Sequence, residues 1–464
     1  MLFPLITFPY ATRVLEADGI GIVNFYQSII SYISLVTCLG IPLYATREIA
    51  KVKNDPCKLS KVTTEILWLH ILLTVCGYIL VVILCFSIPR IKENSILFLI
   101  LSTSIIFTTI GCEWFYRGTE DFKYITIRGI IVRIIYVPLL FCFVRTKNDL
   151  IVYGILTVIA SVGNNSFNFY RLRKFIALHD FKEAIKHPGV HLKGALKIFA
   201  LTAAISIYTQ MNIVILGFMT TATNVGYYVA ATRITTILSG IVTALQTTLL
   251  PRASSLVAQN NAEGFKYTIK KVINFIYCIA LPMSVGLIIM SPEIIYTFCG
   301  PTYEPSVVTL RIVAINLFII ALSGVISGGI LLPLGKENIA TISCILGAIV
   351  NVVFNLIMIP IFFQNGAALA SIATECTVTL SMIFLGRKYI PIKIYENGYL
   401  HYIIASIVMF VACDAIQSFN YGTLYRLIII PIIGIFMYSV VLLTLRDKFA
   451  LEIISQLRRK IFRI

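Results

Sequence analysis

The chain has 464 residues, of which 58% are hydrophobic and 13% charged, whereas a soluble domain carries roughly 25% charged residues. This composition and the mean hydropathy of +0.90 exclude an ordinary water-soluble protein. The formal net charge is +17, but the lysines and arginines lie in short connectors between apolar runs, which favours contact with anionic membrane lipids and no nucleic acid.

Apolar runs of about 20 residues, the length that crosses a ~30 Å hydrocarbon core as a helix, recur along the whole chain. We predict an all-α polytopic membrane protein with about fourteen transmembrane helices. In chain order the spans are expected at 1–13, 21–43, 62–88, 95–116, 125–144, 150–171, 197–219, 225–249, 272–292, 306–332, 338–362, 365–386, 399–418 and 424–445. The first is about half the usual length, which predicts a truncated first helix whose natural start lies upstream of Met1.

The distribution of basic residues over the connectors predicts the orientation of the chain. One alternating set of connectors holds 27 lysines and arginines, and the other set holds six. Because basic connectors are retained in the cytoplasm, we expect a multi-pass membrane protein with both termini in the cytoplasm.

The longest basic connector lies between the sixth and seventh spans and separates two groups of six spans, with the last two spans outside both groups. We expect an N-terminal lobe at 1–175, a connector at 176–196 and a C-terminal lobe at 197–390, followed by two extra spans at 391–445 and a basic amphipathic tail at 446–464. At an offset of 205, residues 18–21 align with 223–226, and Arg47 aligns with Arg252. Such a parallel repeat is typical of two-lobed transporters.

Charged residues inside the spans are the candidates for function, because burying a charge in a membrane costs at least ~2.5–3.5 kcal/mol. Arg133 and Arg233 each lie about 12 Å from the nearer end of a span, whereas Arg13, Arg47 and Arg252 lie nearer the ends. An arginine near the end of a span can extend its guanidinium to the interface or pair with a carboxylate. This is the interpretation that we favour for Arg13, Arg47 and Arg252. A water-filled cavity lined by arginine favours a bound diphosphate, and this is the interpretation for the two deep residues.

Two acidic residues in the spans are candidates for ion coupling. Glu113 precedes Arg117 by four residues, which is the spacing of an ion pair within one helix. Glu375 has no such partner on its own helix, so it is either neutralised by an arginine from another span or acts as a proton carrier.

Amides and phenols interrupt several spans and are the candidate contacts to a sugar. They are Asn24, Gln27, Tyr208, Gln210, Asn351 and Asn355. The alternative is that these groups bond neighbouring helices to one another, at ~0.6 kcal/mol each.

Several motifs along the chain carry a resemblance to a known family. They are L-F-P-L-I-T-F-P-Y-A-T-R-V-L from Leu2, G-I-P-L-Y-A-T-R-E-I-A from Gly40, E-W-F-Y-R-G-T-E-D-F-K-Y-I-T from Glu113, L-L-P-R-A-S from Leu249 and L-L-P-L-G-K-E-N from Leu331. With these the chain resembles, over essentially its whole length, the Wzx-type O-antigen and capsule flippases. Those proteins are polysaccharide transporters of the multidrug/oligosaccharidyl-lipid/polysaccharide (MOP) superfamily.

The resemblance implies two pseudo-symmetric six-helix lobes with two C-terminal helices appended. It also implies outward movement of undecaprenyl-diphosphate-linked oligosaccharide by rocking of the lobes. Arginines of the first, second and eighth spans hold the diphosphate in related flippases, and the matching positions are Arg13, Arg47 and either Arg233 or Arg252. The sequence departs from the family at 16–19, where E-A-D-G replaces the usual glycine after Leu15.

We therefore predict a flippase rather than an enzyme, with a polyprenyl-diphosphate-linked oligosaccharide as cargo and a polysaccharide polymerase and chain-length regulator as further partners. No cofactor or metal is expected, since the 11 cysteines are scattered singly and no C-x-x-C or P-loop pattern is present. The alternatives are a multidrug or cation antiporter of the same fold, which would need acidic residues in its cavity, and a membrane polysaccharide polymerase, which would need a long outer loop.

Overall fold

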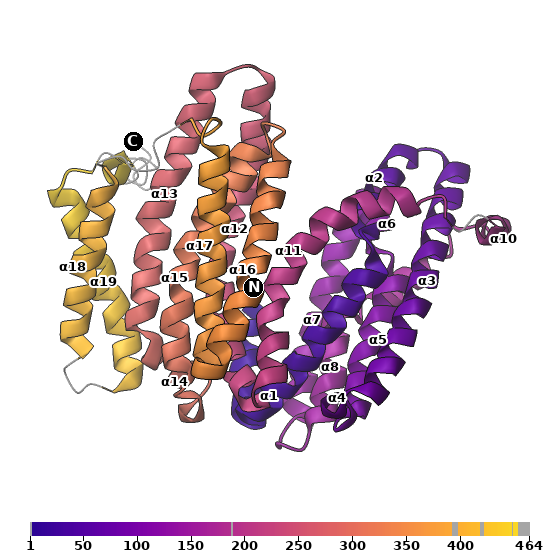
Figure 1. The fold of residues 1–464 in the computed structure, drawn as a ribbon, viewed down its shortest axis with the longest axis horizontal. Coiled ribbons are helices and arrows are strands. Elements are labelled where there is room, and N and C mark those ends of the chain that lie inside the picture. Colours follow the sequence, from indigo (N-terminus) through magenta and orange to yellow (C-terminus); the bar gives the residue numbers. More distant parts are fainter. Residues whose placement is uncertain (1, 187–188, 392–397, 418–421, 448, 453–464) are drawn as a thin grey trace. The chain divides into compact units, whose positions relative to one another are not determined.

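The computed structural model describes residues 2–186, 189–391, 398–417, 422–447 and 449–452. These residues form helices and no strand, which confirms the predicted all-α architecture. The chain divides into two compact units, Leu2–Gly226 and Tyr227–Ile464, and each is described by itself (Figure 1).

In its described residues the first unit contains eleven helices and the beginning of a twelfth. They are α1 (Leu2–Cys38), α2 (Ile41–Val52), α3 (Pro56–Ser87), α4 (Pro89–Lys92), α5 (Ser95–Gly111), α6 (Glu113–Gly118), α7 (Phe122–Phe143), α8 (Leu150–Val162), α9 (Asn165–Leu172), α10 (Leu178–Lys186), α11 (Leu192–Met219) and the start of α12 (Ala222–Ala258).

The second unit continues α12 and contains the remaining described helices. They are α13 (Ala262–Ile289), α14 (Ser291–Phe298), the 3-10 turn η1 (Pro301–Tyr303), α15 (Ser306–Gly324), the π-helical turn η2 (Val325–Leu331), α16 (Glu337–Phe362), α17 (Gln364–Gly386), α18 (Tyr399–Gln417) and α19 (Thr423–Thr444).

Most of the long helices are apolar enough to cross a membrane. Among the described residues eleven candidate spans are found, or twelve if the bent pair α8 and α9 is one span. One of the eleven, Phe3–Val52, joins the predicted first and second spans, and α11 is 28 residues long. The prediction of fourteen spans is consistent with this arrangement.

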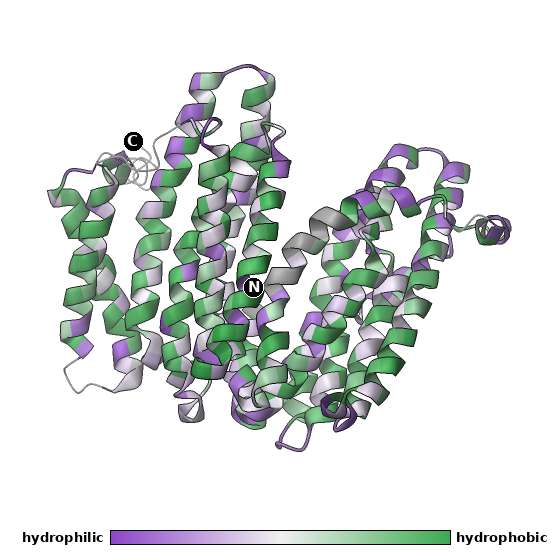
Figure 2. Cartoon of the chain, in the orientation of Figure 1, coloured by the Kyte–Doolittle hydropathy of each residue, from purple (hydrophilic) through white to green (hydrophobic). Residues whose placement is uncertain are grey.

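Hydrophobic residues dominate the middle of the long helices, whereas hydrophilic residues gather at their ends and in the turns (Figure 2). Many large apolar side chains point outward, such as Phe86 at 80% exposure and Ile435 at 68%. Surfaces of this kind are unfavourable in water and suit contact with lipid.

Helix α1 is interrupted at Glu16, between the residues predicted as the first and second spans. The backbone of Glu16 has φ 54° and ψ −174°, a region that is essentially restricted to glycine and costs about 1–3 kcal/mol for other residues. Its carboxylate Oε1 lies 2.7 Å from Lys147 Nζ. The departure from the family's glycine therefore falls on a strained position.

Two glycines allow α1 and the start of α12 to cross in backbone contact. A Cβ added to Gly21 would lie 1.8 Å from the carbonyl oxygen of Ala222, and one added to Gly226 would lie 1.9 Å from that of Ala17. Residues 17 and 21 correspond to 222 and 226 at the offset of 205, so the contact is reciprocal. A two-fold axis between the helices would produce this pattern, although the six-span repeat as a whole stays a prediction.

Helix α11, which the sequence assigns to the C-terminal lobe, packs against α1 and α2 within the first unit. The two units are defined by which helices pack together, whereas the predicted lobes are defined by similarity between the two halves of the sequence. In the second unit, the extra spans α18 and α19 pack against each other, and α18 also packs against α13. Most of the predicted tail at 446–464 lies outside the described residues.

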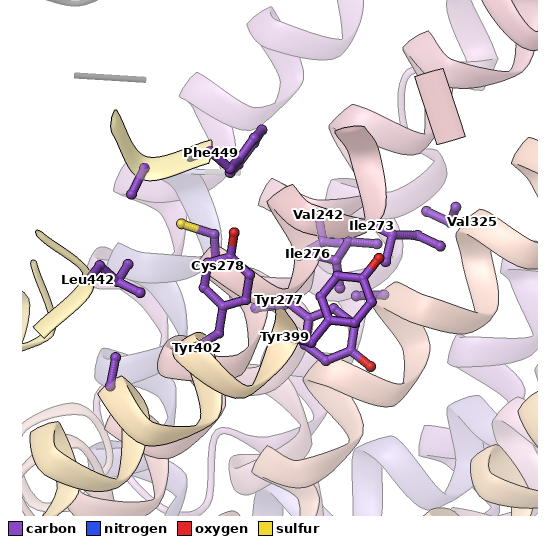
Figure 3. Close-up of a cluster of buried hydrophobic side chains, with 14 of the residues drawn as sticks. Val242, Ile273, Ile276, Tyr277, Cys278, Val325, Tyr399, Tyr402, Leu442 and Phe449 are labelled. Atoms are coloured by element: carbon purple, nitrogen blue, oxygen red, sulfur yellow. The ribbon is translucent and has the colours of Figure 1, made fainter. Parts of the chain in front are cut away.

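The core of the second unit joins α13 to the C-terminal helices (Figure 3). The rings of Tyr277 and Tyr399 stack with their centroids 4.4 Å apart, and Tyr438 donates a hydrogen bond to the carbonyl oxygen of Cys278 at 3.1 Å. Tyr402 lies beside this stack and is fully buried. The core therefore anchors α18 and α19 to α13.

Candidate transport site

The five arginines proposed to bind a diphosphate lie on four helices, and all five are exposed. In the first unit, Arg13 lies on α1, Arg47 on α2 and Arg133 on α7. In the second unit, Arg233 and Arg252 both lie on α12. These two are 19 residues apart, which is about 28 Å along a helix, so α12 presents positive charge at two separate depths.

Arg133 lies on an outward apolar face of α7. Its neighbours Ile130, Ile131 and Ile134 are 45–56% exposed, and within the described residues Arg133 takes part in no ion pair. An arginine at this depth on an apolar face is unfavourable without water or an anion beside it. The position is thus the kind of place where an anionic ligand would compensate the charge.

Glu113 is held by two arginines. Its Oε1 lies 2.6 Å from Nη2 of Arg117, four residues later, and its Oε2 lies 3.5 Å from Nη2 of Arg128 on α7. The Arg117 pair is the contact that the spacing predicted. Arg128 is buried, and no local pattern links it to Glu113, because the two residues come from different helices.

Two helix breaks adjoin this ion-pair cluster. Cys112, between α5 and α6, has a left-handed backbone with φ 42°, and α8 bends by 47° into α9. Asn168 donates to the carbonyl oxygen of Gly111 at 2.6 Å, and Arg128 Nη1 donates to that of Asn164 at 3.1 Å. Carbonyl groups freed by breaks in membrane helices need such donors, and broken helices are common at transport sites.

Three residues of the first unit that are predicted to contact the glycan are half-buried, namely Asn24, Gln27 and Gln210. Asn24 Nδ2 donates to the carbonyl oxygen of Ile20 at 2.8 Å, one turn earlier in α1. Gln27 lies on α1 and Gln210 on α11. The side chain of Tyr208 lies outside the described residues.

Asn351 and Asn355 are fully buried between α16 and α17. Asn355 Nδ2 donates to Oδ1 of Asn351 at 3.0 Å, and Asn351 Nδ2 donates to Oγ1 of Thr374 at 2.9 Å. The first of these bonds lies within α16, and the second joins α16 to α17, which favours the alternative of hydrogen bonding between helices. Glu375 follows Thr374 on α17, is half-buried, and belongs to none of the ion pairs among the described residues.

A large apolar cavity lies in the second unit, beside the core of Figure 3. Its volume is about 650 Å³, and α13, α18 and α19 form most of its wall. The lining includes Gly286, Met409, Gly434 and Tyr438. A wall with so little polar surface suits a hydrocarbon ligand.

Long apolar helices define the chain as a polytopic membrane protein, and broken helices of this kind are common in membrane transporters. Residues 1–257 match the family described as "Polysaccharide biosynthesis protein", which is more than half of the 464 residues. The chain belongs to this family. The Wzx-type resemblance read from the motifs is thereby confirmed at family level.

Two curated relatives cover most of the chain. One, from Escherichia coli (strain K12), is named "Putative O-antigen transporter" and is 26% identical over 394 residues, covering 83% of this chain and 93% of the relative. A protein of the same name from Shigella dysenteriae is 28% identical over 389 residues, covering 82% and 95%.

Two solved structures share the fold of this chain. The lipid II flippase MurJ in an inward closed conformation matches with a TM-score of 0.71 and 18% identity, covering 96% of this chain and 99% of that one. An inward-facing MATE multidrug resistance transporter of the MOP superfamily matches with a TM-score of 0.63 and 18% identity, covering 84% and 94%.

Proposed function

We propose that the chain is a flippase that moves undecaprenyl-diphosphate-linked oligosaccharide outward across the bacterial inner membrane, for synthesis of O-antigen, capsule or exopolysaccharide. The family description and the names of the two relatives support this proposal. Transport proceeds by alternating access, without catalysis by the chain itself.

One observation carries the choice of an anionic cargo. Within the described residues Arg47, Arg133 and Arg252 are exposed and take part in no ion pair, whereas Glu113 contacts Arg117 and Glu65 contacts His191, which leaves Glu375 as the one candidate ion-coupling carboxylate outside these ion pairs. A guanidinium binds paired phosphate oxygens and stays charged at any physiological pH. A cation antiporter would need the opposite arrangement, with carboxylates available to its ligand.

The arginines act at different stages of transport. A single diphosphate is too short to bridge the roughly 28 Å between Arg233 and Arg252, so we assign Arg252 to cytoplasmic loading and Arg233 to a deeper position. Arg47 of α2, which aligns with Arg252, has the loading role in the first unit, and Arg13 of α1 has the deeper role. Arg133 stabilises the headgroup from α7.

The polyprenyl tail stays in an apolar environment, and the cavity along α13, α18 and α19 can accommodate part of it. The glycan contacts Asn24, Gln27, Tyr208 and Gln210, with Asn351 and Asn355 available only if α16 and α17 separate. Glu375 is our candidate for ion coupling. Glu113 is a second candidate, and it would first have to leave its two arginines.

Both termini are cytoplasmic in this proposal, as the excess of basic residues in one set of connectors requires. The polymerase and the chain-length regulator are the proteins expected to receive the cargo on the outer side. Membrane lipids surround the exposed apolar faces.

Complementation tests the proposed cargo. In a strain lacking its own flippase, Arg233→Ala and Arg252→Ala should each reduce surface polysaccharide by at least tenfold at unchanged protein level, since losing one charge-assisted contact costs about 1.5–3 kcal/mol. Arg387→Ala is the matched control, because Arg387 is also exposed but lies just beyond α17, over the ring of Phe384. Full polysaccharide export by both variants would remove these residues from the binding site.

The same variants discriminate the antiporter alternative. Export of cationic dyes by the wild-type chain, unchanged in the arginine variants, would favour the antiporter.

A second experiment addresses the tail. Gly286→Leu introduces a side chain where no atom lies within 4 Å of an added Cβ, so it fills the cavity without a backbone clash. We expect it to weaken binding of undecaprenyl diphosphate to the purified chain, whereas Gly129→Leu, equally uncrowded on α7, should not.

A further inference from the structure

We propose that Arg117 of α6 binds the diphosphate of the cargo together with Arg47 of α2, each arginine holding one of the two phosphate groups. The pair would then set the preference for a diphosphate over a monophosphate. This inference rests on the proposed function, because it adds a second residue to the loading position of Arg47. Both arginines come just after the end of a predicted span, at 21–43 and 95–116, and both side chains are exposed.

Helices α2 and α6 lie alongside each other within the first unit. A Cβ added to Gly118 would lie 3.0 Å from the carbonyl oxygen of Thr46, and the Thr46 hydroxyl donates to the carbonyl oxygen of Trp114 at 3.4 Å. Just beyond the two helices, Lys53 Nζ lies 2.9 Å from Glu120 Oε1. The two helices therefore run in the same direction and are in close contact at Gly118.

This contact brings the two arginines to the same level. Arg47 follows Thr46, and Arg117 precedes Gly118. Because consecutive Cα atoms are about 3.8 Å apart, the contact between Gly118 and Thr46 keeps the Cα atoms of the two arginines within roughly 15 Å of each other. Two arginine side chains can span that separation with one diphosphate between them. The backbone does not have to move for both to bind the same headgroup.

The guanidinium of Arg117 is held in place along one edge. Its Nε and Nη2 donate to Oε1 of Glu113 at 3.0 and 2.6 Å, and the buried Arg128 approaches Oε2 of the same carboxylate with Nη2 at 3.5 Å. A guanidinium has five N–H donors in a planar fork, so the edge formed by Nη1 and Nη2 keeps donors for a phosphate. The side chain is 60% exposed, and fixing it beforehand reduces the entropy lost on binding.

The charge balance around Arg117 favours an anion. Arg117 and Arg128 share the single carboxylate of Glu113, so these three side chains carry a net positive charge, and Arg47 adds to it. The neighbouring carboxylates at the ends of these helices are paired with other cations. These pairs are Glu48 with Lys51, Glu120 with Lys53 and Asp121 with Arg171.

Binding of two lipids that differ by one phosphate tests the role of Arg117. The purified full chain in nanodiscs is titrated with undecaprenyl diphosphate and with undecaprenyl monophosphate, and the wild type should bind the diphosphate more tightly. Arg117→Ala should lower affinity for the diphosphate at least about tenfold, the loss of one charge-assisted contact. Affinity for the monophosphate should fall no more than about twofold, because a single phosphate can still use Arg47.

Arg47→Ala should have the same effect as Arg117→Ala, and the double variant should bind both lipids weakly. The matched control is Arg173→Ala, because Arg173 is an exposed arginine of the first unit whose Cζ lies 5.0 Å from the centroid of the Phe169 ring. It should leave both affinities unchanged.

The outcomes separate this inference from the proposed function. If Arg117→Ala binds the diphosphate as tightly as the wild type while Arg47→Ala does not, the role of Arg117 is overturned and the proposed function stands. An equal loss of affinity for both lipids in Arg117→Ala would indicate a structural role and would also overturn it. A wild-type chain that binds neither lipid would overturn the proposed function, and this inference with it.

Discussion

The crossing of α1 and α12 at Gly21 and Gly226 allows a quantitative prediction for Gly21→Ala. The added Cβ would lie 1.8 Å from the oxygen of Ala222, whereas real Cβ contacts essentially never fall below 3.0 Å. The two backbones must therefore separate by at least the difference, 1.2 Å. Overpacking of this kind costs about 1–3 kcal/mol, although alanine gains up to ~1 kcal/mol over glycine in a helix interior.

The net result of Gly21→Ala should be a loss of about 1–2 kcal/mol in the free energy of unfolding. Gly129→Ala serves as the control, because no atom lies within 4 Å of its added Cβ. It should be neutral or stabilising by up to ~1 kcal/mol. Both variants are measured by denaturant unfolding in the same detergent.

The reciprocal contact also predicts the stability of the double variant that combines Gly21→Ala with Gly226→Ala. Once the helices have moved apart for Gly21→Ala, the clash of Gly226→Ala is largely relieved, so the double variant should lose clearly less stability than the two single losses added together. If Gly21→Ala is as stable as Gly129→Ala, or if the two losses are additive, the reasoning about this crossing is refuted.

Three other outcomes follow from the described contacts. Arg128→Ala leaves the carbonyl oxygen of Asn164 without its donor and removes a buried partner of Glu113. Denaturant unfolding should therefore show that the free energy of unfolding falls by about 3 kcal/mol, whereas Arg117→Ala, at an exposed arginine, should lower it by less than ~1 kcal/mol. Glu16→Gly relieves the left-handed backbone and should raise the free energy of unfolding by about 1 kcal/mol, whereas Glu16→Gln, which removes only the ion pair with Lys147, should change it by less than ~1 kcal/mol. Hydrogen bonds from the backbone of Arg145 and Thr146 and from the Thr146 hydroxyl hold the pKa of Asp149 below its usual range, so their stabilisation is present above the unfolded pKa and is lost as the pH falls through the folded pKa. Asp149→Asn should therefore show lower hydrogen-exchange protection of 145–150 than the wild type at pH 7, and the same protection as the wild type at a pH below the folded pKa.

The sequence alone determined the features that depend on local composition and spacing. The length and apolar content of each run specify a membrane helix, because the bilayer sets both requirements. The spacing of Glu113 and Arg117 predicted their ion pair, since residues four apart share a helix face. The motifs identified the family, and the departure from the family's glycine marked Glu16, where the backbone proved to be strained.

Tertiary structure decided which distant residues meet. Arg128 reaches Glu113 from another helix, and His191 joins Glu65 across more than a hundred residues. Asn351 of α16 donates a hydrogen bond to Thr374 of α17, although the sequence allowed a sugar-binding role equally well. Hydropathy and spacing describe one helix at a time, whereas the side chains that line a cavity or pair across helices depend on how the helices pack together.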